Sequence, residues 1–261
     1  MRVLYWSEVF WPTIGGAEIF AAELMSALRE HGYEFIVVTS HDQSHDHLDL
    51  PDEAEYRGIP IYRFPFRKAL MSGDIGLFIE TQGKVSKVKQ TFGPDLVHIN
   101  AVNPSVLFHL KTANAYPAPM LVRMNQQIVS SQGGGPNTLM SEVLRTADWV
   151  TCVSQAVLDE VHQWVPKIIS RSSVIYNGID LPPLTVEPLP TEAPILLCLG
   201  RLVPAKGFDQ ALTALATILD RFPNVSMVLA GDGSAKLSLE QQTAELGLSE
   251  VVEFMGWVEP D

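Results

Sequence analysis

The stretch Trp11-Pro12-Thr13-Ile14-Gly15-Gly16-Ala17-Glu18 decides the fold, because it joins an apolar segment to an amphipathic one. The segment before it, Val3-Leu4-Tyr5-Trp6, is typical of a buried strand, and residues 17–31 repeat apolar side chains at helical spacing. Two adjacent glycines therefore stand at a turn from strand to helix. Glycine there permits backbone conformations closed to other residues and lets the main chain approach a ligand closely.

A helix that begins at such a turn presents unpaired N–H groups and the positive end of its dipole. Both features suit a phosphate, so Gly15 and Gly16 are candidate phosphate-binding residues. A tight turn that needs small residues and binds nothing explains the same two glycines equally well.

Composition narrows the class of protein. The 261 residues are 46% hydrophobic and 18% charged, which is enough for one sizeable core or two modest ones. A net charge of -12 argues against a nucleic-acid partner, because the phosphate backbone attracts the opposite sign. Cys152 and Cys198 lie in apolar segments, which favours buried thiols over the alternative of a disulfide. No apolar run approaches membrane-spanning length, so we expect a soluble cytoplasmic protein that does not cross a membrane, with peripheral contact left open.

Strand-like and helix-like segments alternate through the first 180 residues, which predicts an α/β fold with a mainly parallel sheet covered on both faces. The segment 59–64 is expected at an edge of the sheet, because Pro60 is poorly tolerated in a central strand. Ligands of such sheets bind outside the carboxyl ends of the strands. The Gly15-Gly16 pair, Asn100 and Asn125 all follow predicted strands and should converge there.

Two polar stretches allow more than one interpretation. The segment 41–47 holds three histidines and two aspartates, which are metal-ligand types, but it lacks the periodicity that would bring them together. We therefore expect a solvated loop and no metal site. The segment 57–89 is basic and partly amphipathic. It fits contact with an anionic membrane or, as the favoured interpretation, a solvated helix face with an apolar back.

Five prolines between residues 181 and 194 predict an extended linker, after which the strand–helix pattern restarts at 195–261. In this second segment Arg201 and Lys206 lie in a glycine-bounded loop. Two cations there, opposite Gly16, would hold a diphosphate between two domains, although an exposed loop with solubilising charges fits the same residues. The segment has only three predicted strands and two helices, so it is expected to leave apolar sheet surface uncovered.

Several short motifs occur along the chain in an order and at a spacing typical of one family. They are Gly15-Gly16-Ala17-Glu18, Pro94-Asp95-Leu96-Val97-His98, Asn177-Gly178-Ile179-Asp180, Gly200-Arg201-Leu202 with Lys206-Gly207, and Ala230-Gly231-Asp232-Gly233. On these motifs the chain resembles the N-terminal two-thirds of a retaining glycosyltransferase of family 4. The resemblance implies a GT-B fold: a Rossmann-like acceptor-side domain over 1–180, a linker over 181–194, and an incomplete Rossmann-like nucleotide-sugar domain over 195–261.

The resemblance also implies a reaction and a set of binding residues. The reaction is transfer of a sugar from a nucleoside-diphosphate sugar to a carbohydrate, lipid or small-molecule acceptor, with retention of the anomeric configuration. Family members generally need neither a metal nor another cofactor. Residues at these positions in the family contact the donor diphosphate (Gly15, Gly16, Arg201 and Lys206), the acceptor or sugar cleft (Glu18, Asn100 and Asn125) and the nucleoside (Gly231, Gly233 and Trp257).

Two departures from the family pattern affect the expected activity. Asn125 stands where the family usually has a catalytic histidine, and asparagine can bind a sugar hydroxyl but cannot shuttle a proton. The family's pair of donor-binding glutamates lies beyond residue 261. We therefore expect impaired activity from this truncated form. The alternative is a non-catalytic binding subunit, or a fragment, whose second domain is completed by a partner chain.

Overall fold

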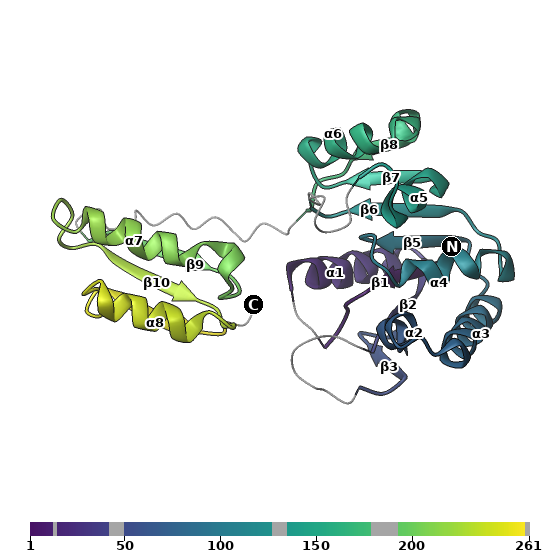
Figure 1. Cartoon of the computed structure of the whole chain (residues 1–261), viewed down its shortest axis with the longest axis horizontal. Helices are drawn as coiled ribbons and strands as arrows, with labels where there is room; N and C mark the ends of the chain where they lie inside the picture. The colour runs from purple at the N-terminus through teal and green to yellow at the C-terminus, as the bar shows by residue number, and fades with distance from the viewer. Residues whose placement is uncertain (13–14, 42–49, 127–134, 179–192, 259–261) are drawn as a thin grey trace. The chain divides into compact units, whose positions relative to one another are not determined.

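A computed structural model describes residues 1–12, 15–41, 50–126, 135–178 and 193–258. The chain divides into two compact units, Met1–Ile179 and Asp180–Asp261 (Figure 1). Residues 181–192 of the predicted linker lie outside the described residues.

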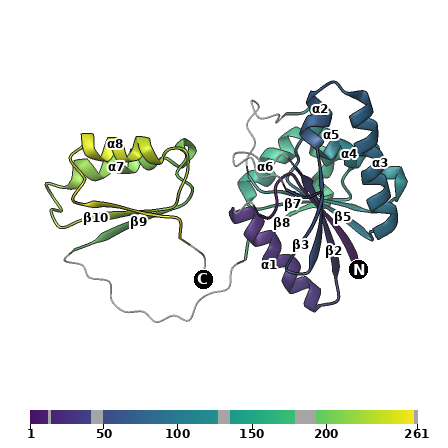
Figure 2. The same ribbon diagram turned by 90° about the horizontal axis from the view of Figure 1, so that it is seen from below.

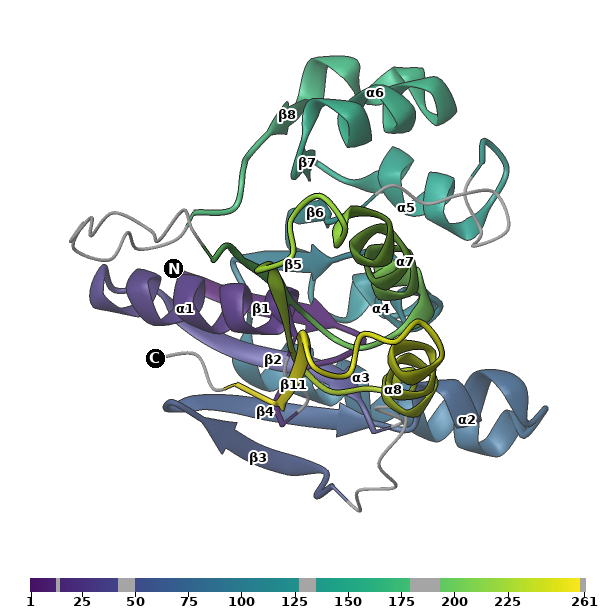
Figure 3. The same cartoon turned by 90° about the vertical axis from the view of Figure 1, so that its left-hand side faces the viewer.

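The first unit is built on one sheet of eight strands in the order β3-β4-β2-β1-β5-β6-β7-β8, which can be followed from edge to edge in Figure 3. All strand pairs are parallel except β3 with β4. The predicted α/β fold with a mainly parallel sheet is confirmed. The strands are β1 (Arg2–Ser7), β2 (Glu34–Ser40), β3 (Glu53–Tyr56), β4 (Ile59–Phe64), β5 (Leu96–Asn100), β6 (Met120–Met124), β7 (Trp149–Cys152) and β8 (Ser172–Val174).

The prediction that 59–64 forms an edge strand is wrong. β4 lies between β2 and β3, and β3 is the edge strand that the sequence analysis missed. Pro60 is tolerated there because the pairing of β4 with β2 begins one residue later, at Ile61. On the other side of β4, the four-residue strand β3 pairs with it in antiparallel fashion and forms the edge of the sheet.

Helices cover both faces of this sheet. Figure 2 shows α1 on one face and α2, α3, α4 and α5 on the other. Residues of β1 alternate accordingly: Val3 and Tyr5 pack with α1, whereas Leu4 and Trp6 pack into the opposite core. The helices are α1 (Gly16–Glu30), α2 (Phe66–Met71), α3 (Ile75–Phe92), α4 (Val106–Lys111), α5 (Leu139–Thr146) and α6 (Gln155–Trp164), with 3-10 turns at Ala113–Ala115 and Pro166–Arg171.

The basic stretch 57–89 spans β4, α2 and most of α3. Asp74 caps α3 by accepting a hydrogen bond from the Leu77 amide at 3.0 Å, and Gly93 ends the helix in the left-handed region. Lys84 and Lys87 are exposed, as a solvated helix face requires. Lys89 is different: it is buried, and its Nζ lies 3.0 Å from Nδ1 of His109 and 3.1 Å from that residue's carbonyl oxygen.

The second unit is a parallel three-stranded sheet in the order β11-β10-β9. Its strands are β9 (Ile195–Leu199), β10 (Ser226–Ala230) and β11 (Val252–Gly256), and its helices are α7 (Phe208–Ile218) and α8 (Lys236–Glu245). Both helices lie on the same face of the sheet (Figure 2). The side chains of Ile195, Leu197 and Leu199 therefore remain exposed, which is the uncovered apolar surface that the sequence predicted.

The two cysteines are free thiols. Cys152 is fully buried at the end of β7, as predicted, whereas Cys198 on β9 is only half-buried.

Candidate functional site

Polar side chains gather at the carboxyl ends of β1, β5 and β6, which are neighbours in the sheet. The register pairs Ser7 with Asn100 and Asn100 with Arg123. Asn125, two residues further along, donates from Nδ2 to Oδ1 of Asn100 at 2.8 Å. Asn100 in turn donates to the Ser7 hydroxyl at 3.4 Å. The predicted convergence of Asn100 and Asn125 therefore occurs, and the two side chains are directly bonded.

Arg123 is the charged member of this cluster, and the sequence analysis did not single it out. Its Nε donates to Oδ1 of Asn125 at 3.0 Å, and its Nη2 donates to Oδ1 of Asn177. The guanidinium also lies over the ring of Phe20 in α1, 4.8 Å from the ring centre. The residue is 5% exposed, and burial lowers its pKa. An arginine remains a cation under such a shift, because its ordinary pKa is above 12.

Three titratable side chains near Arg123, those of Tyr5, His98 and Cys152, have pKa values shifted toward their neutral forms. Burial raises the pKa of Tyr5 well above its ordinary value, against the opposing effect of Arg123 and with a further increase from Glu18. Burial, and to a smaller extent the charge of Arg123, lowers the pKa of His98 to about 4. Burial also raises the pKa of the Cys152 thiol to about 11, against the effect of Arg123.

The first turns of α1 lie near the same cluster, because Phe20 of this helix contacts the Arg123 guanidinium. Gly15 is the N-cap residue and forms no side-chain cap, and the first intrahelical bond runs from the Ile19 amide to the Gly15 carbonyl. Gly15 is extended, with φ of -152°, so the turn does not require a conformation reserved for glycine. That part of the sequence argument is wrong. A Cβ on Gly16 would meet no atom within 4 Å, so the backbone there is open to close approach.

In the second unit, the loop after β9 carries two cations. Arg201 and Lys206 are both exposed, and Lys206 ends a 3-10 turn over Pro204–Lys206. The loop after β10 packs against this first loop: Leu202 donates to the Asp232 carbonyl at 2.9 Å, and the Ala235 amide donates to the Leu202 carbonyl at 2.8 Å. Gly231 and Gly233 lie in that second loop, and Trp257 is exposed after β11.

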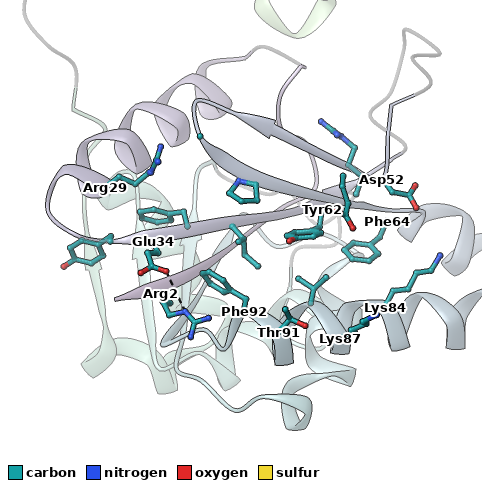
Figure 4. Close-up of a pocket in the computed structure, with 18 of the residues that line it drawn as sticks. Arg2, Arg29, Glu34, Asp52, Tyr62, Phe64, Lys84, Lys87, Thr91 and Phe92 are labelled. Atoms are coloured by element: carbon teal, nitrogen blue, oxygen red, sulfur yellow. Dashed lines mark ion pairs between the residues drawn. The ribbon is translucent and has the colours of Figure 1, made fainter.

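A groove elsewhere in the first unit contains none of the predicted site residues. It has a volume of about 730 Å³ and lies between α3 and the strands β2 and β4. Figure 4 shows Tyr62, Phe64 and Phe92 in its lining, with Lys84 and Lys87 from α3. Arg2 and Glu34 approach within 4.0 Å at one end. This surface is therefore separate from the polar cluster at the carboxyl ends of the strands.

Two sequence-based expectations concern regions that the structure describes only in part. Of the segment 41–47, only His41 is described, and its Nε2 lies 2.7 Å from Oδ1 of Asp52. Within the described part of the chain, no three His, Cys, Asp or Glu side chains are grouped to hold a metal ion. No helix in that part is both long and apolar enough to span a membrane.

The fold and its polar edge define the class of protein: the chain has the GT-B type of fold found in glycosyltransferases. Its fold matches that of a sucrose-phosphate synthase from Thermosynechococcus elongatus, with a TM-score of 0.74, 20% identity and coverage of 99% of this chain and 71% of that one. It also matches WaaG, a glycosyltransferase involved in lipopolysaccharide biosynthesis, with a TM-score of 0.65, 14% identity and coverage of 98% and 70%.

The chain belongs to glycosyltransferase family 4. The model of that family matches residues 14–182, and the model of glycosyl transferases group 1 matches residues 185–261. Among curated relatives, the lipopolysaccharide core biosynthesis glycosyltransferase LpsD of Rhizobium meliloti is 26% identical over 98% of this chain. The alpha-monoglucosyldiacylglycerol synthase of Streptococcus pneumoniae is 21% identical over 100% of it. The chain spans 66% and 62% of the lengths of these two relatives.

Proposed function

We propose that the protein takes part in transfer of a sugar from a nucleoside-diphosphate sugar to an acceptor, with retention of anomeric configuration. The observation that carries this proposal is the bonded cluster of Asn100, Asn125 and Arg123 at the carboxyl edge of the sheet, where ligands of such folds bind. Membership of family 4 supports the same function.

Asn125 has the hydrogen-bonding capacity to orient a sugar. Its Oδ1 accepts from Arg123 and its Nδ2 donates to Asn100, which leaves one lone pair and one N–H for a sugar hydroxyl. An amide cannot take up a proton at neutral pH. In this proposal the acceptor attacks the face that the leaving diphosphate vacates, and the diphosphate oxygen receives the acceptor's proton.

In the second unit, we propose the exposed cations Arg201 and Lys206 as residues that bind the donor diphosphate. In the first unit, we propose the Gly16 amide as a hydrogen-bond donor to a phosphate oxygen. Gly15 adjoins that amide, and Glu18 lies in the first turn of the same helix. Gly231, Gly233 and Trp257 are the residues proposed on the nucleoside side. No metal is required in this scheme, because the protein cations neutralise the diphosphate.

Calorimetry with UDP and with GDP tests the donor assignment. We expect at least one of the two nucleotides to bind, and Lys206→Ala to weaken it about 10-fold, the order expected when a charge-assisted contact is lost. Arg221→Ala is the matched control, since Arg221 is an exposed cation of the same unit that stacks on Phe222. Unchanged affinity in Lys206→Ala, or no binding of either nucleotide, would contradict the assignment.

We also propose a peripheral membrane contact through the end of α2 and the start of α3. Met71, Ile75 and Ile79 are 73%, 74% and 62% exposed. Ile75 and Ile79 are four residues apart on α3 and therefore share one face of the helix. Exposed Arg67 and Lys68 on α2 supply positive charge beside this apolar surface, a combination that suits an anionic membrane.

Sedimentation with vesicles tests this contact. We expect more binding to vesicles containing phosphatidylglycerol than to pure phosphatidylcholine, and about 10-fold weaker binding for the double variant Ile75→Ser with Ile79→Ser. Ile169→Ser is the control, because Ile169 is also exposed in the first unit but lies in the turn Pro166–Arg171. Equal loss of binding in the control would refute a specific contact.

The open face of the second sheet favours the alternative function, a binding subunit completed by a partner chain. Leu197 and Leu199 are exposed on β9, and burying them would provide a driving force for association. Size-exclusion chromatography with light scattering distinguishes the two functions. A monomer that binds a nucleotide supports the enzyme, whereas obligate association without nucleotide binding supports the subunit.

A further inference from the structure

The guanidinium of Arg123 is a buried cation at the carboxyl edge of the first sheet. None of the ion pairs among the described residues involves it. Its neighbours Tyr5, His98 and Cys152 are neutral, and its hydrogen-bond acceptors are the amide oxygens of Asn125 and Asn177. Burying an uncompensated charge is costly, so buried charges in proteins are normally paired.

Glu18 is an acidic residue of α1 that acts electrostatically on this region. Glu18 affects the Tyr5 hydroxyl electrostatically, but its carboxylate is directed to the start of its own helix. There its Oε2 would come within 2.4 Å of a Cβ placed on Gly15. Among the described residues, the amide oxygens of Asn125 and Asn177 and the ring of Phe20 orient the cation.

The geometry of the guanidinium is fixed, and part of it is unused. The guanidinium of arginine has five N–H donors. Two of them are bonded to Asn125 and Asn177, and the other three have no hydrogen bond identified to the described residues. The Asn125 amide is itself fixed by its bond to Asn100, and Phe20 supports one face of the guanidinium. A planar fork with free donors is suited to two oxygens of a phosphate or carboxylate.

We propose that Arg123 binds an oxyanion carried by the acceptor, so that this protein glycosylates a phosphorylated or carboxylated acceptor. That the bound molecule is an acceptor rests on the proposed function. That it carries an oxyanion rests on the geometry around Arg123. Arg123 is then a specificity-determining residue: it selects acceptors by charge, while Asn125 and Asn100 bind hydroxyl groups beside it.

Inorganic phosphate and glucose 6-phosphate are the probes for this anion site, with glucose as the uncharged counterpart. We expect the wild-type protein to bind glucose 6-phosphate about 10- to 100-fold more tightly than glucose in calorimetry. In NMR, the Arg123 Nε–H resonance should shift on addition of inorganic phosphate. Arg123→Gln should abolish the preference, and Arg123→Lys, which keeps the charge but loses the fork, should keep part of it.

Matched variants separate this site from the donor site and from general charge effects. Arg171→Gln removes one cation from the same unit and should leave the preference unchanged. Lys206→Ala should weaken UDP or GDP but leave glucose 6-phosphate binding intact. If Arg123→Gln weakens the nucleotide as strongly as glucose 6-phosphate, the oxyanion is the donor diphosphate and the inference is overturned.

The inference and the proposed function can fail separately. No preference for glucose 6-phosphate over glucose in the wild-type protein refutes the anion site, whatever the nucleotides do, and requires no variant to fold. Absence of nucleotide binding together with Arg123-dependent phosphate binding refutes the donor assignment but leaves the anion site. Thermal unfolding of Arg123→Gln and Arg123→Lys shows which variant is folded, and the folded one decides the role of the side chain.

Discussion

The two units each carry glycines in turns that follow strands, but the turns are built differently. At the start of α1, a Cβ on Gly16 would meet no atom of the described residues within 4 Å, and a Cβ on Gly15 would meet the flexible Glu18 side chain. In the second unit, a Cβ on Gly231 would lie 1.9 Å from the Gly200 carbonyl oxygen, and one on Gly233 would lie 2.5 Å from that of Leu202. One pair leaves the backbone accessible, and the other pair lets two loops touch.

This difference teaches that a glycine-rich turn has at least two physical causes. Gly231 and Gly233 are required for packing. The loops after β9 and β10 are joined by backbone hydrogen bonds, and their backbones lie so close together that no Cβ fits at either glycine. Gly15 and Gly16 have no such structural requirement. Among the described residues, the backbone at Gly16 leaves room for close approach, which is compatible with a ligand there.

Substitution of Gly231 gives the largest expected effect. Gly231→Ala places a methyl group on the Gly200 backbone, at a residue with φ of 144°, so we expect the second unit to lose roughly 4 kcal/mol or more of stability. Urea unfolding followed by the fluorescence of Trp257 measures this loss, with the tryptophans of the first unit replaced by phenylalanine.

The matching substitution is Gly16→Ala, which should change stability by less than about 1 kcal/mol because the added methyl group meets nothing. Under the proposed function it should nevertheless weaken nucleotide binding, by obstructing approach to the amide. A large loss of stability in Gly16→Ala would show that the turn is closed like that of the second unit.

The sheets of the two units differ in how far their apolar side chains are buried. Substitution of one leucine in each sheet tests this difference. Leu4 in β1 is fully buried between layers, whereas Leu197 in β9 is 65% exposed. We expect Leu4→Ala to cost about 3–5 kcal/mol and Leu197→Ala less than about 1 kcal/mol. Chemical denaturation of each variant measures both values. Similar costs would mean that something covers β9 in solution.

The fold was largely predictable because its signal is local. Alternating apolar and amphipathic segments identify the parallel strands and their helices. Local signals also mark helix starts: Ser154 is the N-cap of α6, and its hydroxyl accepts from the Val157 amide. β3 was missed because Glu53-Ala54-Glu55-Tyr56 has few apolar residues and depends on pairing with β4. Because β3 was missed, β4 was wrongly predicted to be the edge strand.

The site was predictable only where topology alone determines it. Asn100 and Asn125 converge because adjacent parallel strands end at the same edge. The isolated charge of Arg123 depends on which side chains surround it, and these come from β1, β5, β7 and α1. The one available signal was an arginine within the otherwise apolar strand Met120-Leu121-Val122-Arg123-Met124. Lys89 was wrongly assigned to a solvated helix face, because its burial also depends on neighbours that are distant in the sequence.

Buried cations distinguish the first unit from the second, whose cations Arg201 and Lys206 are exposed. Burial lowers the pKa of Lys89 to about 7, and burial followed by the charge of Lys89 lowers that of His109 to about 3. The unfolded chain binds a proton at Lys89 up to a pH near 10.5, but the folded protein does so only below about 7. Stability should therefore rise with pH between about 7 and 10.5, and the full cost of charging Lys89 is present below that window.

Lys89→Met removes this contribution and keeps the volume of the side chain. The stability of the variant relative to wild type should be higher at pH 6 than at pH 9, by about 1–3 kcal/mol, because only the wild type gains stability as Lys89 loses its proton. Urea denaturation at the two pH values gives the difference. Lys87→Met, an exposed lysine of the same helix, should show no such change with pH. If Lys89→Met and wild type differ equally at both pH values, Lys89 is not neutralised in the fold, and its Nζ must carry its charge against the carbonyl and ring of His109.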